Sequence, residues 1–436
     1  MQSDEDPERT AGTSRSVRGL VERFAVDLTP LRVSRDFRLL YLGLLVSQAG
    51  YQFTLIAIFI QVRDLTGSAA AVGLTGLFGL VGLVIGSLVT ASFVDAHDRR
   101  LLLISAQFGN MVASGILLAG AIAGDPPLWV IYGAVALIGF LSTIDGPVRG
   151  AMTPRLVGLE LVPSALALQQ VVWTATALVG PALAGIVVAR FGLAWAYGFD
   201  VVTYVAMLFA AIAIRPMAPD RAGDRATGWA AVREGYRFVR RSRLLVSTFI
   251  VDLVAMVFGL PRALFVFLAV SQFERGPEVV GLLFAAPAVG ALLGAATSGW
   301  TKRVSRQGTA VLWAVLAWGA AIAAFGLVEN LWIGLALLAV AGWADVISAI
   351  FRSTILQVSV PDHLRGRTQG IHILVVTGGP RLGDVEAGLV AAWTSPATSV
   401  VTGGLACIVG AGLVAWFFPE LRRYRAGTIE TAPLEE

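Results

Sequence analysis

The stretch Ala91-Ser-Phe-Val-Asp95-Ala-His-Asp98-Arg99-Arg100 separates two long apolar segments of the chain. The first of these ends near Ser92, and the second begins at Leu101. About 20 apolar residues are enough to cross the hydrocarbon core of a bilayer as a helix, and charged side chains stay outside it. A short charged turn between two such segments therefore predicts that the chain reverses at a membrane surface.

The composition of the whole chain also points to a membrane. Hydrophobic residues make up 56% of the 436 residues, charged residues only 14%, and the mean hydropathy is +0.75. A soluble domain carries about 25% charged residues, so this balance requires lipid around the protein. The first 36 residues are polar and the first apolar run is too long for a signal-peptide core, so no cleavable signal is expected.

Twelve apolar segments are expected to cross the membrane as helices, six on each side of the longest polar connection. The expected organisation is a tail (1–36), a six-helix bundle (37–214), an inter-bundle loop (215–244), a second bundle (245–418) and a C-terminal tail (419–436). Most segments are long enough to span a bilayer with some tilt. The segments are Phe37–Val62, Ala69–Ser92, Leu101–Ala123, Leu128–Ala151, Ser164–Ala189, Leu193–Ile214, Leu245–Ser271, Val279–Trp300, Ala310–Val328, Leu331–Ser353, Gly370–Trp393 and Ser399–Phe418.

Basic residues set the expected orientation. Of the 33 Lys and Arg residues, 26 fall on one side, in the tails and alternate loops, and the opposite side has only Arg63, Arg190 and Arg275. Cytoplasmic loops carry the excess of positive charge, so both termini are expected in the cytoplasm. Val17–Leu28 fits either a helix on an anionic membrane surface or a loosely structured tail, and Ala230–Arg241 fits a short surface helix.

The two bundles repeat each other in sequence. Corresponding residues are separated by about 203–208 positions, in the same order and orientation. Two parallel six-helix repeats place a cavity at their interface, near the middle of the bilayer. The corresponding pairs are Arg38 with Arg243, Gly82 with Gly290, Gly86 with Gly294, Arg149 with Arg352, Gly180 with Gly383 and Gly185 with Gly388.

The charged turn after the second segment resembles the cytoplasmic signature loop of the major facilitator superfamily. The resemblance implies that an acid and paired basic residues hold the ends of neighbouring helices, and that their contacts change when the two halves move. A topology signal without a switching role is the alternative. The residues that match the family pattern are Asp95, Arg99 and Arg100. Ala91, Ala96 and Asp98 depart from that pattern, and the acidic residue at position 98 is similar to that of enterobactin-exporting members.

The second half resembles more specifically the branch that exports siderophores such as enterobactin, together with related drug exporters. The resemblance covers nearly all of residues 35–420 and implies an all-α membrane protein with twelve transmembrane helices in two parallel repeats. It also implies proton-driven export of a hydrophobic or amphipathic small molecule. The motifs that carry it are Gly281-Leu-Leu-Phe-Ala-Ala, Gly290, Gly294, Thr297-Ser298-Gly299, Gly342-Trp343, Leu356-Gln357, Pro361, Gly366-Arg367 and Gly370.

Gly180-Pro181 with Gly185 resembles the glycine-proline motif in the fifth helix of antiporters of this superfamily. Small residues let two helices approach closely, and a proline leaves a carbonyl unpaired and bends the helix. Helix packing alone explains this pattern equally well.

Ionisable residues inside the apolar segments are the candidates for proton coupling or gating. Charges in hydrocarbon are costly unless paired or hydrated, so they are expected to face the cavity between the bundles. Asp252 is the first choice for coupling, because a proton and a substrate can compete for such a carboxylate. Structural pairs or gates are the alternative for Asp145 with Arg149 and for Asp345 with Arg352, which share a helix face. The remaining candidates are Arg262, Arg381, Asp384 and Glu386, while His372 is expected to be a packing residue and Asp200 a helix–helix hydrogen-bonding residue.

Polar and aromatic side chains are expected to form the wall of the substrate cavity. Glutamine and tyrosine on one face of an apolar helix are unusual against lipid. The predicted wall residues are Gln48, Tyr51, Gln52, Gln170, Trp173, Phe258 and Phe265.

Several function classes lack their motifs in this sequence. No glycine-rich phosphate loop precedes Lys302, the only lysine, and no nucleophile elbow, metal-binding spacing or repeated channel filter is present. No cofactor, metal or nucleic acid is therefore expected, and the chain is not expected to be an enzyme.

The sequence is interpreted as a proton-coupled secondary transporter in a bacterial inner membrane. The family resemblance implies that the protein is a monomer. Its partners are a small-molecule substrate, protons and the lipid bilayer. A siderophore such as a catecholate is the leading substrate. A multidrug antiporter for hydrophobic or cationic antibiotics is the first alternative, and a receptor or scaffold without transport is the second.

Overall fold

The computed structural model describes residues 27–93, 97–124, 126–217 and 229–426, whose regular secondary structure is entirely helical. Side-chain caps begin several helices, as where the Ser34 hydroxyl accepts a hydrogen bond from the Phe37 amide at 3.1 Å. Such caps satisfy amides that the first turn leaves without partners. The α-helices are α2 (Thr29–Val33), α3 (Arg35–Thr66), α4 (Ala69–Phe93), α5 (Arg99–Ala123), α6 (Leu128–Val157), α7 (Val162–Phe191), α8 (Leu193–Ala213), α9 (Trp229–Arg241), α10 (Arg243–Phe258), α11 (Phe265–Ser271), α12 (Pro277–Thr297), α13 (Gln307–Phe325), α14 (Leu331–Ser359), α15 (Asp362–Trp393), α16 (Pro396–Phe417) and α17 (Pro419–Arg423), and the 3-10 helices are η2 (Leu159–Leu161), η3 (Arg262–Leu264) and η4 (Ser298–Arg303).

Eleven helical segments of the described chain are long and apolar enough to cross a bilayer. They correspond to every predicted segment except the eleventh, Gly370–Trp393. Helix α15, which contains that segment, has 32 residues and is long enough to span. Its apolar half carries Arg381, Asp384 and Glu386, and these charges set it apart from the other eleven. The protein is thus a multi-pass membrane protein, and the twelfth crossing stays a prediction.

The seventh predicted segment, Leu245–Ser271, is not one continuous helix, which corrects the expectation from hydropathy. Helix α10 ends at Phe258, and the chain resumes as η3 and α11. Pro261 has no amide hydrogen to donate, so it cannot continue the helical hydrogen-bond ladder. The break is fixed in place because the indole Nε1 of Trp318 donates to the Gly259 carbonyl at 2.8 Å.

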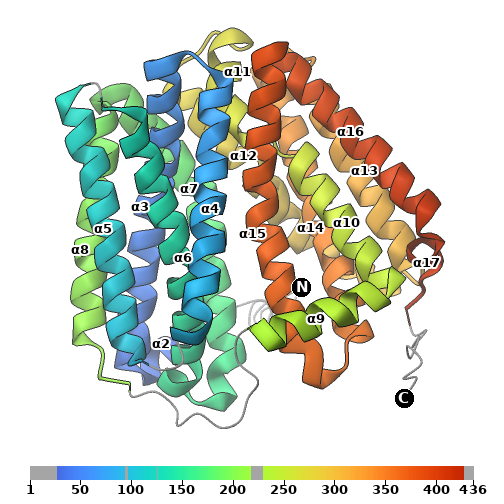
Figure 1. The fold of residues 1–436 in the computed structure, drawn as a ribbon, viewed down its shortest axis with the longest axis horizontal. Helices are drawn as coiled ribbons and strands as arrows, with labels where there is room; N and C mark the ends of the chain where they lie inside the picture. Colours follow the sequence, from blue (N-terminus) through green and yellow to red (C-terminus); the bar gives the residue numbers. More distant parts are fainter. Residues whose placement is uncertain (1–26, 94–96, 125, 218–228, 427–436) are drawn as a thin grey trace, which may run out of the picture.

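The helices form two groups, α3–α8 and α10–α16, that lie side by side (Figure 1). Helix α4 packs on α15, and α7 packs on α12, so these two pairs join the groups. Helices α2 and α9 lie at one end of the molecule, here called the α9 end. The short helix α11 lies at the opposite end, called the α11 end (Figure 1).

The polar segments contain short helices that pack on the two groups. Most of the expected surface helix Val17–Leu28 lies outside the described residues. The Asp27 carboxylate accepts hydrogen bonds from the Thr29 hydroxyl and amide and from the Ser164 hydroxyl of α7, and these bonds lower the pKa of Asp27. In the long connection, α9 packs on α10 and α15, where Glu234 pairs with Arg367 at 2.5 Å.

Asp200 of α8 is a buried hydrogen-bonding centre inside the first group. Its Oδ2 accepts from the Thr54 hydroxyl of α3 at 2.5 Å and from the Ser114 hydroxyl of α5 at 2.6 Å. Three helices therefore meet at one carboxyl group, which is fully buried.

Replacing Asp200 by alanine is expected to lower the free energy of unfolding by about 2–4 kcal/mol, because two buried hydroxyls lose their acceptor. Thermal unfolding of the purified protein in detergent would measure this loss. The control is Glu329→Ala, which removes an acidic side chain at an exposed position after α13. Equal melting temperatures for the two variants would contradict the assignment.

Candidate functional site

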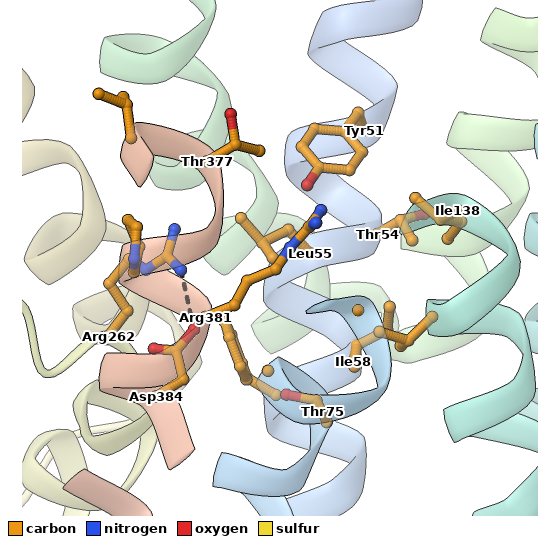
Figure 2. Close-up of a pocket in the computed structure, with 16 residues that line it drawn as sticks. Tyr51, Thr54, Leu55, Ile58, Thr75, Ile138, Arg262, Thr377, Arg381 and Asp384 are labelled. Carbon is orange, nitrogen blue, oxygen red and sulfur yellow. Dashed lines mark hydrogen bonds and ion pairs between the residues drawn. The ribbon is translucent and has the colours of Figure 1, made fainter. Parts of the chain in front are cut away.

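A cavity of about 220 Å³ lies between the two groups of helices (Figure 2). Helices α3, α4 and α6 form one wall, and η3 with α15 form the other. Its apolar lining is interrupted by tyrosine, threonine, arginine and aspartate side chains. The lining residues are Tyr51, Thr54, Leu55, Ile58, Phe59, Thr75, Gly76, Gly79, Val135, Ile138, Arg262, Val376, Thr377, Pro380, Arg381 and Asp384.

The break after α10 brings Arg262 to this cavity. Its Nη2 pairs with Asp384 Oδ2 of α15 at 2.8 Å, and the Ala263 amide donates to Asp384 Oδ1 at 3.2 Å. The Asp384 side chain is only 2% exposed, and both of its oxygens are engaged. A continuous seventh helix could not offer that backbone amide, because its hydrogen bond would go to the preceding turn.

Arg381 extends across the cavity toward Tyr51 (Figure 2). The side chain lies close to Gly79 of α4, where a Cβ atom would be 3.3 Å from the guanidinium Nε. The absence of a side chain at Gly79 therefore leaves room for the arginine between α4 and α15. Arg381 Nη1 is buried and has no hydrogen-bond partner among the described residues.

A second charged cluster joins α10, α14 and α15 inside the second group. Arg352 Nη1 lies 2.9 Å from Asp252 Oδ1, and Arg352 Nη2 lies 3.6 Å from Asp345 Oδ1. The side chains of Arg352 and Asp252 are 2% and 1% exposed, whereas Asp345 is 34% exposed. His372 Nδ1 lies 4.0 Å from Asp252 Oδ2, and its ring also packs near Phe249. The nearest carboxylate to Arg352 is thus Asp252 on another helix, in addition to the Asp345 expected on its own helix.

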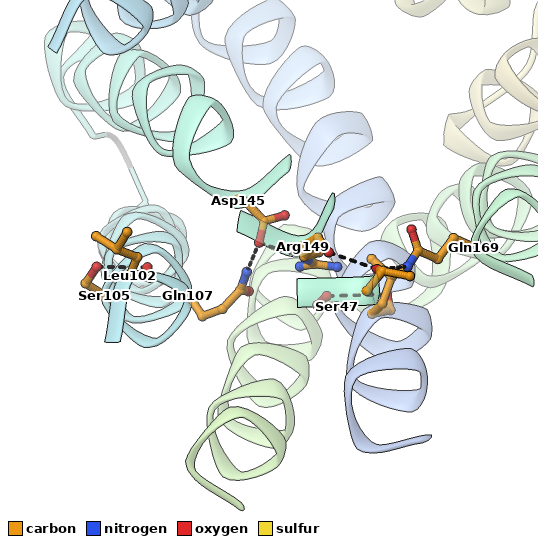
Figure 3. A network of polar contacts seen from close by, with 9 residues as sticks. Ser47, Leu102, Ser105, Gln107, Asp145, Arg149 and Gln169 are labelled. Atoms are coloured by element: carbon orange, nitrogen blue, oxygen red, sulfur yellow. Dashed lines mark hydrogen bonds and ion pairs between the residues drawn. The ribbon is translucent and has the colours of Figure 1, made fainter. Parts of the chain in front are cut away.

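A third cluster lies in the first group, around Arg149 of α6 (Figure 3). Arg149 Nε donates to Asp145 Oδ1 at 2.8 Å, and Gln107 of α5 donates to the same oxygen at 2.7 Å. Gln169 of α7 donates to the Thr153 hydroxyl at 3.0 Å, and Thr153 in turn donates to the Arg149 carbonyl at 2.9 Å. The cluster therefore combines one ion pair with neutral polar side chains.

Residues 25–433 match the family described as transmembrane secretion effectors. The chain belongs to this family. It is therefore a major facilitator transporter with a small-molecule substrate, and not an enzyme.

Known proteins of similar sequence and fold cover nearly the whole chain. The enterobactin exporter EntS of Salmonella typhi is 26% identical over 417 residues, which is 95% of this chain and 99% of the relative. The exporter of Escherichia coli (strain SMS-3-5 / SECEC) is 26% identical over 409 residues, with 93% and 97% covered.

Two solved structures share the fold. A POT family transporter in complex with 5-aminolevulinic acid has a TM-score of 0.71 at 10% identity, covering 89% of this chain and 97% of that chain. A bacterial homologue of the iron transporter ferroportin, in an inward-facing state, has a TM-score of 0.65 at 15% identity, covering 89% and 99%.

In this transporter the described part of the signature loop makes contacts within the first group. Asp98 Oδ2 accepts from a backbone amide after α8 at 3.1 Å, and Arg100 Nε donates to a carbonyl of α8 at 3.2 Å. Arg99 Nη1 donates to a carbonyl of α6 at 3.3 Å. These bonds tie the start of α5 to the ends of α6 and α8. Asp95 lies outside the described residues.

Two contacts between glycines, the glycine crossings, join the groups of the transporter near the α11 end. Gly73 of α4 meets Gly388 of α15, and Gly185 of α7 meets Gly281 of α12. The Pro181 carbonyl also lies against Gly281, so two members of the predicted helix 5 motif belong to the second crossing. A Cβ atom at any of the four glycines would meet backbone atoms of the facing helix.

The predicted wall residues of the transporter are dispersed. Tyr51 lines the cavity, whereas Phe265 lies in the apolar core at an edge-to-face contact with Phe284, with ring centroids 5.1 Å apart. Phe265 is therefore a packing residue, because the break before α11 turns it inward. Gln52 lies against Gly180, the third member of the helix 5 motif. The other predicted residues outside the lining are Gln48, Gln170, Trp173 and Phe258, together with Glu386 from the coupling candidates.

Sequence reasoning missed the contacts that join separate helices. Thr54, Thr75 and Ile138 line the cavity, and Gln107 donates a hydrogen bond to Asp145. None of these four residues belongs to a recognisable sequence motif. The glycines of α4 were a usable signal, since a row of small residues marks a face where another helix or side chain can approach.

Proposed function

We propose that this protein exports an amphipathic small molecule, a catecholate-type siderophore or a related metabolite, by proton-coupled alternating access. The transporter is placed in the bacterial inner membrane as a monomer of twelve helices, with the α9 end and both termini in the cytoplasm. Similarity to enterobactin exporters over 95% of the chain supports the substrate. The observation that carries the mechanism is the cavity between two groups of helices that touch at one end.

The glycine crossings support alternating access. Both lie near the α11 end, so the cavity is closed there when the paired helices touch. Glycine contacts hold helices by close packing without side-chain interlocking, and this allows the groups to part and close again. In this proposal the structure corresponds to a state that is shut on the outer side, and the residue ranges 37–214 and 245–418 are the moving halves.

Proton coupling is assigned to Asp252, which lies in the cluster with Arg352 and His372. By the repeat offset, Ser47 and Gln169 are the residues of the first half that correspond to Asp252 and His372. Both halves have the arginine, as Arg149 and Arg352. Among the ion pairs of the described residues, Arg149 pairs only with Asp145 of its own helix (Figure 3), whereas Arg352 also pairs with Asp252 of another helix. The asymmetry favours the second half as the place where a proton binds.

A counterflow experiment tests transport and substrate together. Proteoliposomes loaded with unlabelled enterobactin are expected to accumulate labelled enterobactin from outside without any imposed gradient. Exchange of ethidium but not of enterobactin would favour the multidrug alternative. Binding of a substrate without exchange would favour a receptor or scaffold and would reject the proposal.

A further inference from the structure

The charges that line the central cavity do not balance. Its charged lining residues are Arg262, Arg381 and Asp384, which leaves one positive charge in excess. Both oxygens of Asp384 are already engaged by Arg262 and by the Ala263 amide. No carboxylate of the described chain lies within ion-pair distance of Arg381.

The position of Arg381 makes this excess charge available to a ligand. Its side chain points into the cavity toward Tyr51 (Figure 2), and its buried Nη1 has no partner in the described part of the protein. A cation at membrane depth is costly unless it is paired or hydrated, so this position favours an anion entering the cavity.

We infer that the transported molecule is bound through an anionic group with two adjacent oxygens, a carboxylate or a catecholate, held by Arg381. The planar guanidinium presents parallel N–H donors that match such a pair of oxygens. The inference rests on the proposed function, in which a small molecule passes through this cavity, and it names the chemical class of that molecule.

The cavity volume sets how much of the molecule is held. About 220 Å³ is smaller than the roughly 300–1,000 Å³ of sites that enclose a drug-sized ligand. The cavity in this state therefore takes one aromatic acid or one arm of a larger amphipathic molecule. A cationic group is disfavoured, because the uncompensated guanidinium repels it. The geometry thus separates an anionic siderophore from the cationic drugs of the alternative.

Calorimetric titration of the full-length protein in lipid nanodiscs tests the inference with three ring compounds of similar size. Salicylate carries the carboxylate, salicylamide is its neutral counterpart, and benzylamine is a cation. Wild type is expected to bind salicylate most tightly. Arg381→Gln is expected to weaken salicylate binding by at least about tenfold and to leave salicylamide binding unchanged, since a charge-assisted pair is lost.

Two further variants keep the result interpretable. Arg190→Gln removes a positive charge at the exposed end of α7 and should bind like wild type. Arg381→Lys keeps the charge without the planar fork and should bind salicylate with intermediate affinity, which distinguishes a lost contact from a misfolded protein. Equal salicylate affinity in wild type and Arg381→Gln, tighter binding of benzylamine than of salicylate, or no binding of salicylate by wild type would each overturn the inference.

The outcomes also separate this inference from the proposed function. Arg381-dependent salicylate binding without enterobactin counterflow would support the anion site and reject siderophore export. Enterobactin counterflow that is unchanged in Arg381→Gln would support export and reject the anion site.

Discussion

Replacing Asp252 by asparagine is expected to abolish proton movement that depends on substrate. The variant keeps the shape of the side chain but cannot carry the negative charge that lies 2.9 Å from Arg352. Arg352 would then be left, 2% exposed, with only the more distant Asp345. Removing one partner of a buried ion pair costs about 3–5 kcal/mol, so a lower melting temperature is also expected.

A double-mutant cycle separates coupling from stability. The double variant Asp252→Asn with Arg352→Gln removes both charges, so it is expected to regain stability without regaining coupling. Asp345→Asn, at a partly exposed position, is expected to have the smaller effect on stability. Substrate-driven proton movement that persists in Asp252→Asn would move the coupling site to Asp145, Asp345, Asp384 or Glu386.

Replacing Gly281 by leucine is expected to disfavour closure of the α11 end and to reduce counterflow by at least about fivefold. A Cβ at this position would already meet the Pro181 carbonyl and the Ala182 backbone of α7. Overpacking of a tight contact costs about 1–3 kcal/mol, which changes a two-state equilibrium by about 5- to 150-fold. The same result is expected for Gly388→Leu at the other crossing.

The control for this prediction is Gly412→Leu. Gly412 also lies inside a helix, α16, but a Cβ there meets no atom within 4 Å. Reaction of a cysteine introduced at Tyr51 with a membrane-impermeant thiol reagent, in a variant without Cys407, would measure access from the outer side. Wild-type access in Gly281→Leu would show that the crossing does not control closure.

Local patterns explain which parts of the structure could be predicted from sequence. Hydropathy predicted the positions of the apolar helices closely, because the hydropathy of a helix is set mainly by its own residues. For example, the predicted segment Ala69–Ser92 corresponds to α4, Ala69–Phe93. The pair of Asp145 and Arg149 was also predictable, since residues four apart share a helix face. Pro261 indicates the break between α10 and α11, which hydropathy alone does not predict.

Contacts between distant segments explain what could not be predicted. Asp252 and Arg352 are one hundred positions apart, and their 2.9 Å contact depends on how α10 packs beside α14. The cavity also brings together residues of α3 and α15. The hydrophobic periodicity of each helix does not specify how the two helices are rotated relative to each other. Phe265 was assigned to the cavity wall from its apolar ring, but the turn before α11 decides which way that ring points.

Proton-coupled export is tested most directly by the pH inside proteoliposomes that contain the purified protein and a pH gradient. Enterobactin is added outside, and a trapped fluorescent dye reports the lumenal pH. We expect enterobactin to accelerate proton movement through wild type and to have no such effect through Asp252→Asn. Enterobactin that crosses the membrane without changing the lumenal pH in wild type would contradict proton coupling.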